Sequence, residues 1–354
     1  MRQRPEGDRS LKVEIRVVLA FLVPLAISFG ITSLMIRWAP ALRLVDIPND
    51  RKVHTRPIPK GGGLAIFAGW VLTALWIGVD SEDLWIWRGI GLVIVVLGLV
   101  DDIRPLPWQL RLGIQMIAAV GAVVVFGGIP SPAWFPFANY WLWPIAVIWI
   151  VGLTNAFNML DNMDALSAGV AWIVAAFFLY CFFPFGFSFL LLALMGALTG
   201  FLWFNWPPAR IFMGDAGSTF LGFFFGTCSL VYAGMSDPNA WALVLCFLVI
   251  PWYDLVSVVT IRIWQGRSPF HADKQHLSHR LVALGLSPPR AVGVICLLAI
   301  AIGAGGLLLY QKPSRGNIGV WIFLVSCWIG LAAFDYLTRK KRQTKIEPLQ
   351  IQPS

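Results

Sequence analysis

The sequence predicts an all-α protein, a polytopic membrane bundle of ten or eleven transmembrane helices. Hydrophobic residues make up 58% of the 354 residues and charged residues only 13%, and the mean hydropathy is +0.74. Apolar runs long enough to cross ~30 Å of hydrocarbon as helices recur along the chain. Tryptophans stand at the ends of several runs, as an interfacial aromatic belt requires: Trp85, Trp87, Trp108, Trp134, Trp141 and Trp143.

The apolar runs define eleven candidate spans. The first is longer than the apolar region of a signal peptide and has no clear small-residue cleavage site, so we interpret it as an anchor. The third and fifth are the least sharply bounded, because Trp and Pro blur their edges. In order, the runs fall near residues 17–37, 62–79, 84–100, 110–128, 141–157, 165–183, 186–204, 218–235, 240–262, 291–310 and 317–337.

These runs predict three segments: a polar N-terminus (1–16), a transmembrane domain with catalytic loops (17–337) and a basic tail (338–354). Loops after odd-numbered spans, with the tail, contain 19 of the 27 Lys and Arg residues. Basic loops stay in the cytoplasm, so the odd-numbered loops are expected there, although the basic residues before the first span oppose this orientation. Because such loops account for the net charge of +9, no nucleic-acid partner is expected. The five cysteines lie in apolar runs without CxxC spacing, which predicts neither disulfides nor a zinc site.

Nearly all the unusual polar residues fall in five odd-numbered connections. These are segments 45–63, 101–102, 155–164, 204–218 and 262–280. Carboxylates beside apolar helices are costly unless they are paired or liganded. Independent helix caps would not all fall on one side of the membrane, so the sequence predicts one polar site on the cytoplasmic face.

The acids of these loops suit a magnesium–diphosphate site. Asp101 and Asp102 directly follow an apolar helix, and Asp161 and Asp164 share a face if their stretch is helical. Asp215 precedes a helix start, whose free N–H groups favour a phosphate. Mg²⁺ prefers oxygen ligands and takes one or two carboxylates, with phosphate and water filling the remaining positions. Basic residues of the first and fifth loops are then expected to bind the phosphates.

Each motif alone also has a structural interpretation. Asp101 and Asp102 could end a helix in water, and Asp161 and Asp164 could cap one. The run Gly61–Gly63 is better explained by close helix packing. Asp254, inside the ninth span, is interpreted as a structural hydrogen-bonding residue. A secondary transporter is an alternative of another class, although transporters bind at the bilayer midplane through broken helices.

With these five motifs in this order, the chain resembles the polyprenyl-phosphate N-acetylhexosamine-1-phosphate transferases, the glycosyltransferase family 4 type, from about Asp46 to Leu286. Segment 268–281 resembles the undecaprenyl-phosphate N-acetylglucosamine-1-phosphate transferase branch. The resemblance implies a Mg²⁺-dependent enzyme, with Mn²⁺ as the substitute. Its reaction moves N-acetylhexosamine-1-phosphate, GlcNAc-1-phosphate in this branch, from a UDP-sugar to undecaprenyl phosphate and releases UMP. This is the first membrane step of a cell-envelope polysaccharide.

A phospho-N-acetylmuramoyl-pentapeptide transferase-like activity is the alternative within the family. The resemblance further implies the bacterial inner membrane, an active site facing the cytoplasm and, as an open expectation, a homodimer. One-step transfer and a two-step route through a phospho-aspartate at Asp101 both remain open.

The resemblance also assigns roles to residues. The catalytic residues are Asp101, Asp102 and Asp161, and the metal ligands are Asp215 and Asp102. The nucleotide and metal pocket is expected to include Asn158, Asp164, Asn205 and Phe212, with Phe212 stacking on uracil. The other substrate-binding residues, expected at the phosphates, are Lys52, His54, Arg267, His276, His279 and Arg280. Asn162 and Ala165 replace usual glycines and Ser278 a usual histidine, which leaves an inactive, structural member as another alternative.

Overall fold

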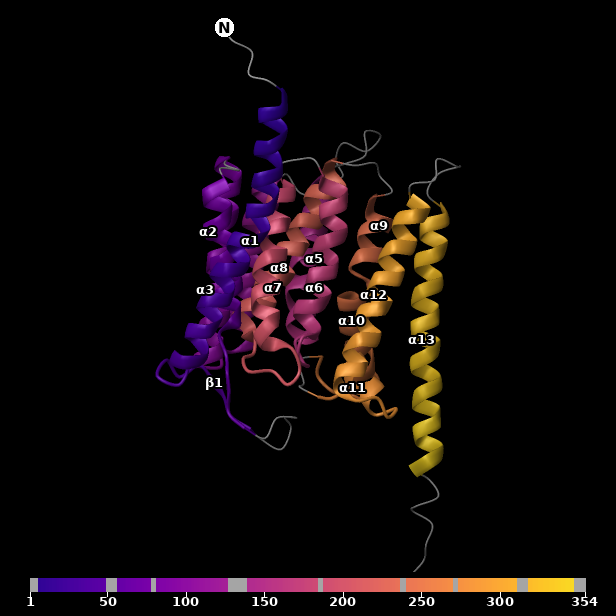
Figure 1. Ribbon diagram of the computed structural model, residues 1–354. Helices are drawn as coiled ribbons and strands as arrows, with labels where there is room; N and C mark the ends of the chain where they lie inside the picture. Colours follow the sequence, from indigo (N-terminus) through magenta and orange to yellow (C-terminus); the bar gives the residue numbers. More distant parts are fainter. Residues whose placement is uncertain are drawn as a thin grey trace, which may run out of the picture. The chain divides into compact units, whose positions relative to one another are not determined.

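The computed structural model describes residues 6–48, 56–77, 81–126, 139–183, 187–235, 240–269, 273–310 and 318–346, and these are almost entirely helical (Figure 1). The chain divides into two compact units, residues 1–238 and 239–354, each described here by itself. The all-α prediction is confirmed. Lys52 and His54 lie outside the described residues.

The predicted membrane bundle is also confirmed. Among the described residues, eight helices are long and apolar enough to cross a membrane, and one further candidate is a helix pair bent by 72°. Two shorter apolar helices, Gly62–Ile77 and Leu166–Phe182, correspond to the second and sixth predicted runs. Every predicted run therefore matches a helix or, for the ninth run, the bent pair.

The first unit is a bundle of roughly parallel and antiparallel helices with one short hairpin (Figure 1). Helix α8 packs mainly against α5 and α3, and α1 packs against α7 and α2. The strands pair antiparallel, Val45 with Pro59 and Asp46 with Ile58. The elements are α1 (Glu6–Trp38), β1 (Val45–Asp46), β2 (Ile58–Pro59), α2 (Gly62–Ile77), α3 (Glu82–Ile103), α4 (Trp108–Phe126), α5 (Asn139–Leu160), α6 (Leu166–Phe182), α7 (Phe187–Asn205) and α8 (Gly214–Met235).

Helix α3 shows how local sequence sets the position of polar residues. Its N-cap Ser81 accepts a hydrogen bond from the backbone N–H of Leu84 at 3.3 Å, and Glu82 and Asp83 in the first turn complement the helix dipole. The helix ends at Ile103, shortly before a proline that removes a backbone donor. The last turn of this apolar helix therefore carries the two adjacent aspartates, Asp101 and Asp102.

An aromatic cluster fills the core of the first unit. The rings of Trp70 and Trp87 meet edge to face at 5.5 Å, and Phe224 lies 5.6 Å from Trp70. Trp87 is only 1% exposed, so its assignment to the interfacial belt is wrong: it lies on the buried face of α3. Of the other predicted belt residues, Trp85, Trp108 and Trp143 are exposed, while the side chains of Trp134 and Trp141 lie outside the description.

The predicted packing role of the glycine run is confirmed. A Cβ atom on Gly63 would collide with the backbone of Gly217 in the first turn of α8. The backbone N–H of Gly63 donates to the carbonyl of Met213 at 2.9 Å, and Gly62 donates to Phe212 at 3.1 Å. Because no side chain separates them, the starts of α2 and α8 lie in direct backbone contact.

The second unit contains α9 (Ala240–Phe247), α10 (Val249–Trp264), α11 (Leu277–Val282), α12 (Pro288–Tyr310) and α13 (Ile318–Ile346). Helix α12 packs against α9 and α13. The bend between α9 and α10 falls at Leu248, three residues before Pro251. Pro251 has no N–H to donate to the carbonyl of Phe247, so the series of backbone hydrogen bonds is interrupted at this point, which favours the bend.

Candidate functional site

Three carboxylates gather where α3, α4 and α8 meet, and we call Asp101, Asp102 and Asp215 the acidic cluster. Arg111, in the first turn of α4, joins two of them. Its Nη1 lies 2.7 Å from Oδ2 of Asp101 and 3.2 Å from Oδ2 of Asp215. Residues more than one hundred positions apart in the chain thus share one guanidinium.

Asp102 is the buried member of the acidic cluster, with a side chain only 1% exposed. Its Oδ2 accepts a hydrogen bond from the backbone N–H of Ala216 at 3.2 Å, in the first turn of α8. Lys60 places its Nζ 3.7 Å from Oδ1 of Asp102 and 3.3 Å from Asp46. The expectation of a free helix start for phosphate is therefore wrong at Ala216, because Asp102 already occupies that donor.

Asp215 is the most accessible member, since its side chain is 31% exposed against 8% for Asp101. Asn158, near the end of α5, donates its Nδ2 to Oδ1 of Asp215 at 3.0 Å. The same nitrogen lies 3.1 Å from the hydroxyl of Ser218. Arg111 and Asn158 therefore hold the two oxygens of Asp215 from two different helices.

Asp161 directly follows α5, near the acidic cluster. Burial, followed by repulsion from the carboxylates of Asp102 and Asp164, raises the pKa of Asp161 to about 7. Burial alone would lower the pKa of Lys60, but the carboxylates of Asp102 and Asp46 outweigh it and raise that pKa above its usual value. One carboxyl group near the cluster thus titrates near neutrality, while its neighbouring ammonium stays charged.

The residues predicted at the nucleotide organise two loops. Oδ2 of Asp164 accepts from the backbone N–H of Ala209 at 2.9 Å. Asn205 is buried, accepts from the N–H of Ala165 at 2.9 Å and donates to the carbonyl of Ile211 at 2.8 Å. Asp164 and Asn205 therefore tie the turn after α5 to the loop between α7 and α8.

Phe212, in that same loop, has its backbone N–H bonded to the carbonyl of Pro59 at 2.8 Å, and its residue surface is partly exposed. Ala165 has a φ of +61°, a left-handed conformation that favours glycine. A glycine, which the resemblance implies at this position, would adopt this conformation without the steric cost that Ala165 carries.

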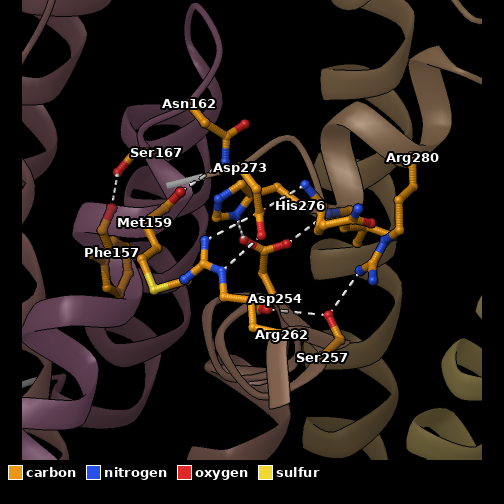
Figure 2. A network of polar contacts seen from close by, with 12 residues as sticks. Phe157, Met159, Asn162, Ser167, Asp254, Ser257, Arg262, Asp273, His276 and Arg280 are labelled. Atoms are coloured by element: carbon orange, nitrogen blue, oxygen red, sulfur yellow. Dashed lines mark hydrogen bonds and ion pairs between the residues drawn. The ribbon is translucent and has the colours of Figure 1, made fainter. Parts of the chain in front are cut away.

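In the second unit, Asp254 and His276 form a buried pair (Figure 2). His276 Nδ1 lies 2.7 Å from Oδ2 of Asp254, and the backbone N–H of Leu277 donates to Oδ1 at 2.7 Å. Asp254 therefore makes the hydrogen bonds predicted for it, and one of its partners, His276, is a predicted substrate-binding residue. Arg262 binds Asp273 through two nitrogens at 3.0 and 3.2 Å, and these bonds outweigh burial and lower the pKa of Asp273.

The other basic residues predicted to bind phosphate differ in their surroundings. Arg280 is buried and lies 3.0 Å from the carboxylate of Asp335. It also donates to the hydroxyl of Ser257 at 2.8 Å (Figure 2). Burial, followed by the electrostatic influence of His276, lowers the pKa of His279. Arg267 is exposed at the end of α10. Ser278, at the usual histidine position, is buried.

Arg111 and Lys60 are the site residues that the sequence reasoning missed. The sequence assigns no role to Arg111, and Lys60 falls only under the general expectation that basic residues of the first loop bind phosphate. A signal was present for each, because Arg111 is the single charge of the apolar helix α4 and Lys60 directly precedes the glycine run. A single charged residue at the end of an apolar membrane helix predicts a residue of opposite charge at the same depth in the membrane.

The donor set of the acidic cluster fits a magnesium ion of the predicted kind. Among the described residues, no group of three or more His, Cys, Asp or Glu is arranged to hold a metal by itself. Mg²⁺ does not require such a group, since one or two carboxylates with substrate phosphate and water complete its coordination. Asp215 is partly accessible, and Asp102 supplies a second hard oxygen donor nearby.

The fold and this site define a polytopic membrane protein with a carboxylate-rich polar centre at its helix ends. The model of glycosyl transferase family 4 matches residues 84–233. A probable undecaprenyl-phosphate N-acetylglucosaminyl 1-phosphate transferase of Bacillus subtilis is 34% identical, over 89% of each chain. A decaprenyl-phosphate N-acetylglucosaminephosphotransferase of Mycobacterium leprae is 29% identical over 94% of each. An undecaprenyl-phosphate alpha-N-acetylglucosaminyl 1-phosphate transferase of Thermotoga maritima is 27% identical over 90% of this chain and 98% of its own.

The chain therefore belongs to glycosyl transferase family 4 and is a sugar-phosphate transferase.

Proposed function

We propose that this protein transfers N-acetylglucosamine-1-phosphate from UDP-N-acetylglucosamine to undecaprenyl phosphate, in the presence of Mg²⁺. The observation that carries the proposal is the acidic cluster, gathered from α3 and α8 around Arg111 at the ends of membrane helices. A lipid phosphate and a soluble nucleotide can meet only at such a boundary. The names of the Bacillus subtilis and Thermotoga maritima relatives support the acceptor and the transferred group.

The reaction is a phosphoryl transfer that needs no additional reactant. An oxygen of the lipid phosphate forms a bond to the β-phosphorus of the UDP-sugar. The bond between that phosphorus and the bridging oxygen breaks, and its electron pair leaves with UMP. The products are undecaprenyl-diphosphate-N-acetylglucosamine and UMP. Positioning and charge stabilisation supply most of the acceleration in reactions of this type.

Asp215 and Asp102 would hold the Mg²⁺, and the ion would neutralise charge on the diphosphate. Asp161 suits the role of general base, because a pKa of about 7 lets it accept the proton of a lipid monophosphate. Both oxygens of Asp101 are engaged, Oδ1 by the N–H of Leu106 at 2.6 Å and Oδ2 by Arg111 at 2.7 Å. These bonds orient the carboxylate of Asp101 and leave further lone pairs on both oxygens, so direct transfer and a phospho-aspartate at Asp101 both stay open.

The nucleotide is proposed to bind beside the two loops that Asp164 and Asn205 hold together, with Phe212 against the uracil. Binding of the substrate phosphates by the six basic residues of the first and fifth connections stays a prediction, as do the cytoplasmic orientation in an inner membrane and a homodimer. The transporter hypothesis loses its support, because the chain belongs to a transferase family.

The test incubates purified protein with undecaprenyl phosphate, Mg²⁺ or Mn²⁺, and a panel of UDP-sugars that includes UDP-GlcNAc, UDP-GalNAc and UDP-MurNAc-pentapeptide. Mass spectrometry then identifies lipid-linked product, and UMP is quantified. Asp215→Asn should abolish metal-dependent UMP release, whereas Asp83→Asn, an exposed acid at the other end of α3, should keep it. Absence of product from every sugar, or full activity of Asp215→Asn, would overturn the proposal.

A further inference from the structure

An amide pair joins α4 and α5 one turn away from the acidic cluster. Asn155 donates its Nδ2 to Oε1 of Gln115 at 2.8 Å, and the same nitrogen lies 2.8 Å from the carbonyl of Val151. Gln115 is only 5% exposed. Both residues lie inside candidate membrane spans, where an unpaired amide is costly, so the hydrogen bond is favoured over separation.

The spacing of this pair relates it to Asp215. Gln115 follows Arg111 by four residues on α4, and Asn155 precedes Asn158 by three residues on α5, so each couple shares a helix face. Arg111 and Asn158 bind different oxygens of Asp215, at 3.2 and 3.0 Å. The two helices thus contact each other through the amide pair and, one turn further on, contact one carboxylate from two sides.

We infer that Gln115 and Asn155 are positioning residues for the transferase reaction, which fix the rotation and the register of α4 against α5. This inference rests on the proposed function. With the pair in place, Arg111 and Asn158 approach Asp215 together, and its carboxylate is held in one orientation. A shift of α4 by about 1 Å would move the guanidinium off both aspartates, and displacements of that size cost about a hundredfold in rate.

The amide pair permits a reciprocal exchange as a test. Gln115→Asn shortens the bridge by one methylene and Asn155→Gln lengthens it by one, so each single variant mismatches the gap and the double variant restores its length. We expect each single variant to lower kcat at least about tenfold, with the KM for UDP-N-acetylglucosamine changed less than about threefold. The double variant should recover most of kcat. Ser229→Ala, which removes the 2.7 Å bond from Trp149 between α5 and α8 far along both helices, should leave kcat unchanged.

A double-mutant cycle identifies the route of the effect. Gln115→Leu should lower kcat in the native background and have little further effect when Arg111→Gln is already present, because the pair acts through Arg111. Purified variants are compared at equal amounts of folded protein, with the unfolding temperature measured in the same detergent. Loss of thermal stability with an unchanged kcat, failure of the double exchange to rescue, or additive effects in the cycle would each overturn the inference. An inactive native protein would instead refute the proposed function.

Discussion

Gly214 offers a sharp test of how the acidic cluster is built. It begins α8 with a φ of +74°, and a Cβ atom there would collide with all three terminal atoms of the Asp102 carboxyl group. Gly214→Ala therefore carries two costs. The left-handed backbone costs an L-residue about 1–2 kcal/mol. The collision forces the buried carboxyl group of Asp102 away from the N–H of Ala216, and a hydrogen bond to a charged group contributes about 1.5–3 kcal/mol.

The expected result is a loss of about 2.5–5 kcal/mol in the free energy of unfolding, with transferase activity reduced at least about a hundredfold because the cluster is displaced. Gly285 is the matched control: its φ is +103° and no atom lies within 4 Å of a Cβ built there. Gly285→Ala carries only the backbone cost and should keep kcat. UMP release and thermal unfolding in detergent measure both effects. Equal losses of stability and activity in the two variants would refute the claim that the position of the Asp102 carboxyl group requires glycine at residue 214.

Three further predictions concern stability. The pKa of Asp161 is raised to about 7 from about 4 in the unfolded chain. The stability that this carboxyl group contributes is therefore complete below pH ~4 and is lost as pH rises through about 7. The unfolding temperature of Asp161→Asn should depend less on pH between about pH 5 and 8 than that of the native protein. Asp335→Asn leaves the buried Arg280 without its charge partner and should lower the unfolding free energy by about 3 kcal/mol in a denaturation series. Gly63→Ala forces α2 away from the backbone of Gly217 and should reduce the yield of folded protein. Size-exclusion chromatography measures that yield.

Each of these predictions has an outcome that contradicts it. An unfolding temperature that falls equally with pH in the native protein and in Asp161→Asn would exclude that carboxyl group as the source. An unfolding free energy that is unchanged in Asp335→Asn would mean that Arg280 finds another partner. Gly89→Ala, at a position of α3 where a Cβ meets nothing within 4 Å, controls for the glycine test, and an equal loss of folded protein there would exclude the helix contact.

The helical membrane architecture was predictable because it depends on composition and run length. Hydrocarbon imposes nearly the same length on every span, so each apolar run became one helix or one bent pair. The gathering of Asp101, Asp102 and Asp215 was also predictable, since costly carboxylates on one side of a membrane have few ways to be compensated. Trp87 was misassigned because a tryptophan at a helix end fits an interface and a protein core equally well, and only the packing of α3 against its neighbours decides.

The partners within the site could not be read from the sequence. Arg111 and Lys60 carry the same charge as many loop residues, and their position depends on which helix ends meet. The occupation of the Ala216 N–H by Asp102 depends on a contact between residues 114 positions apart. Similarly, the pairing of Arg280 with Asp335 joins α11 to a helix near the C-terminus. Such contacts follow from tertiary packing, which a periodic pattern does not encode.

The balance of charge in the acidic cluster argues for a cation supplied with the substrate. Asp101, Asp102 and Asp215 carry three negative charges when ionised. Among the described residues, the bases that form ion pairs with them within 4 Å are Arg111 and Lys60, which carry two positive charges. Lys60 also neutralises Asp46, so its charge is shared. Two anionic substrates would add further negative charge to a site whose carboxylates, when ionised, already outnumber its bases. Electrostatics would then oppose binding unless a divalent cation enters with the diphosphate, and Asp215, as the most accessible carboxylate of the three, is where that cation would bind.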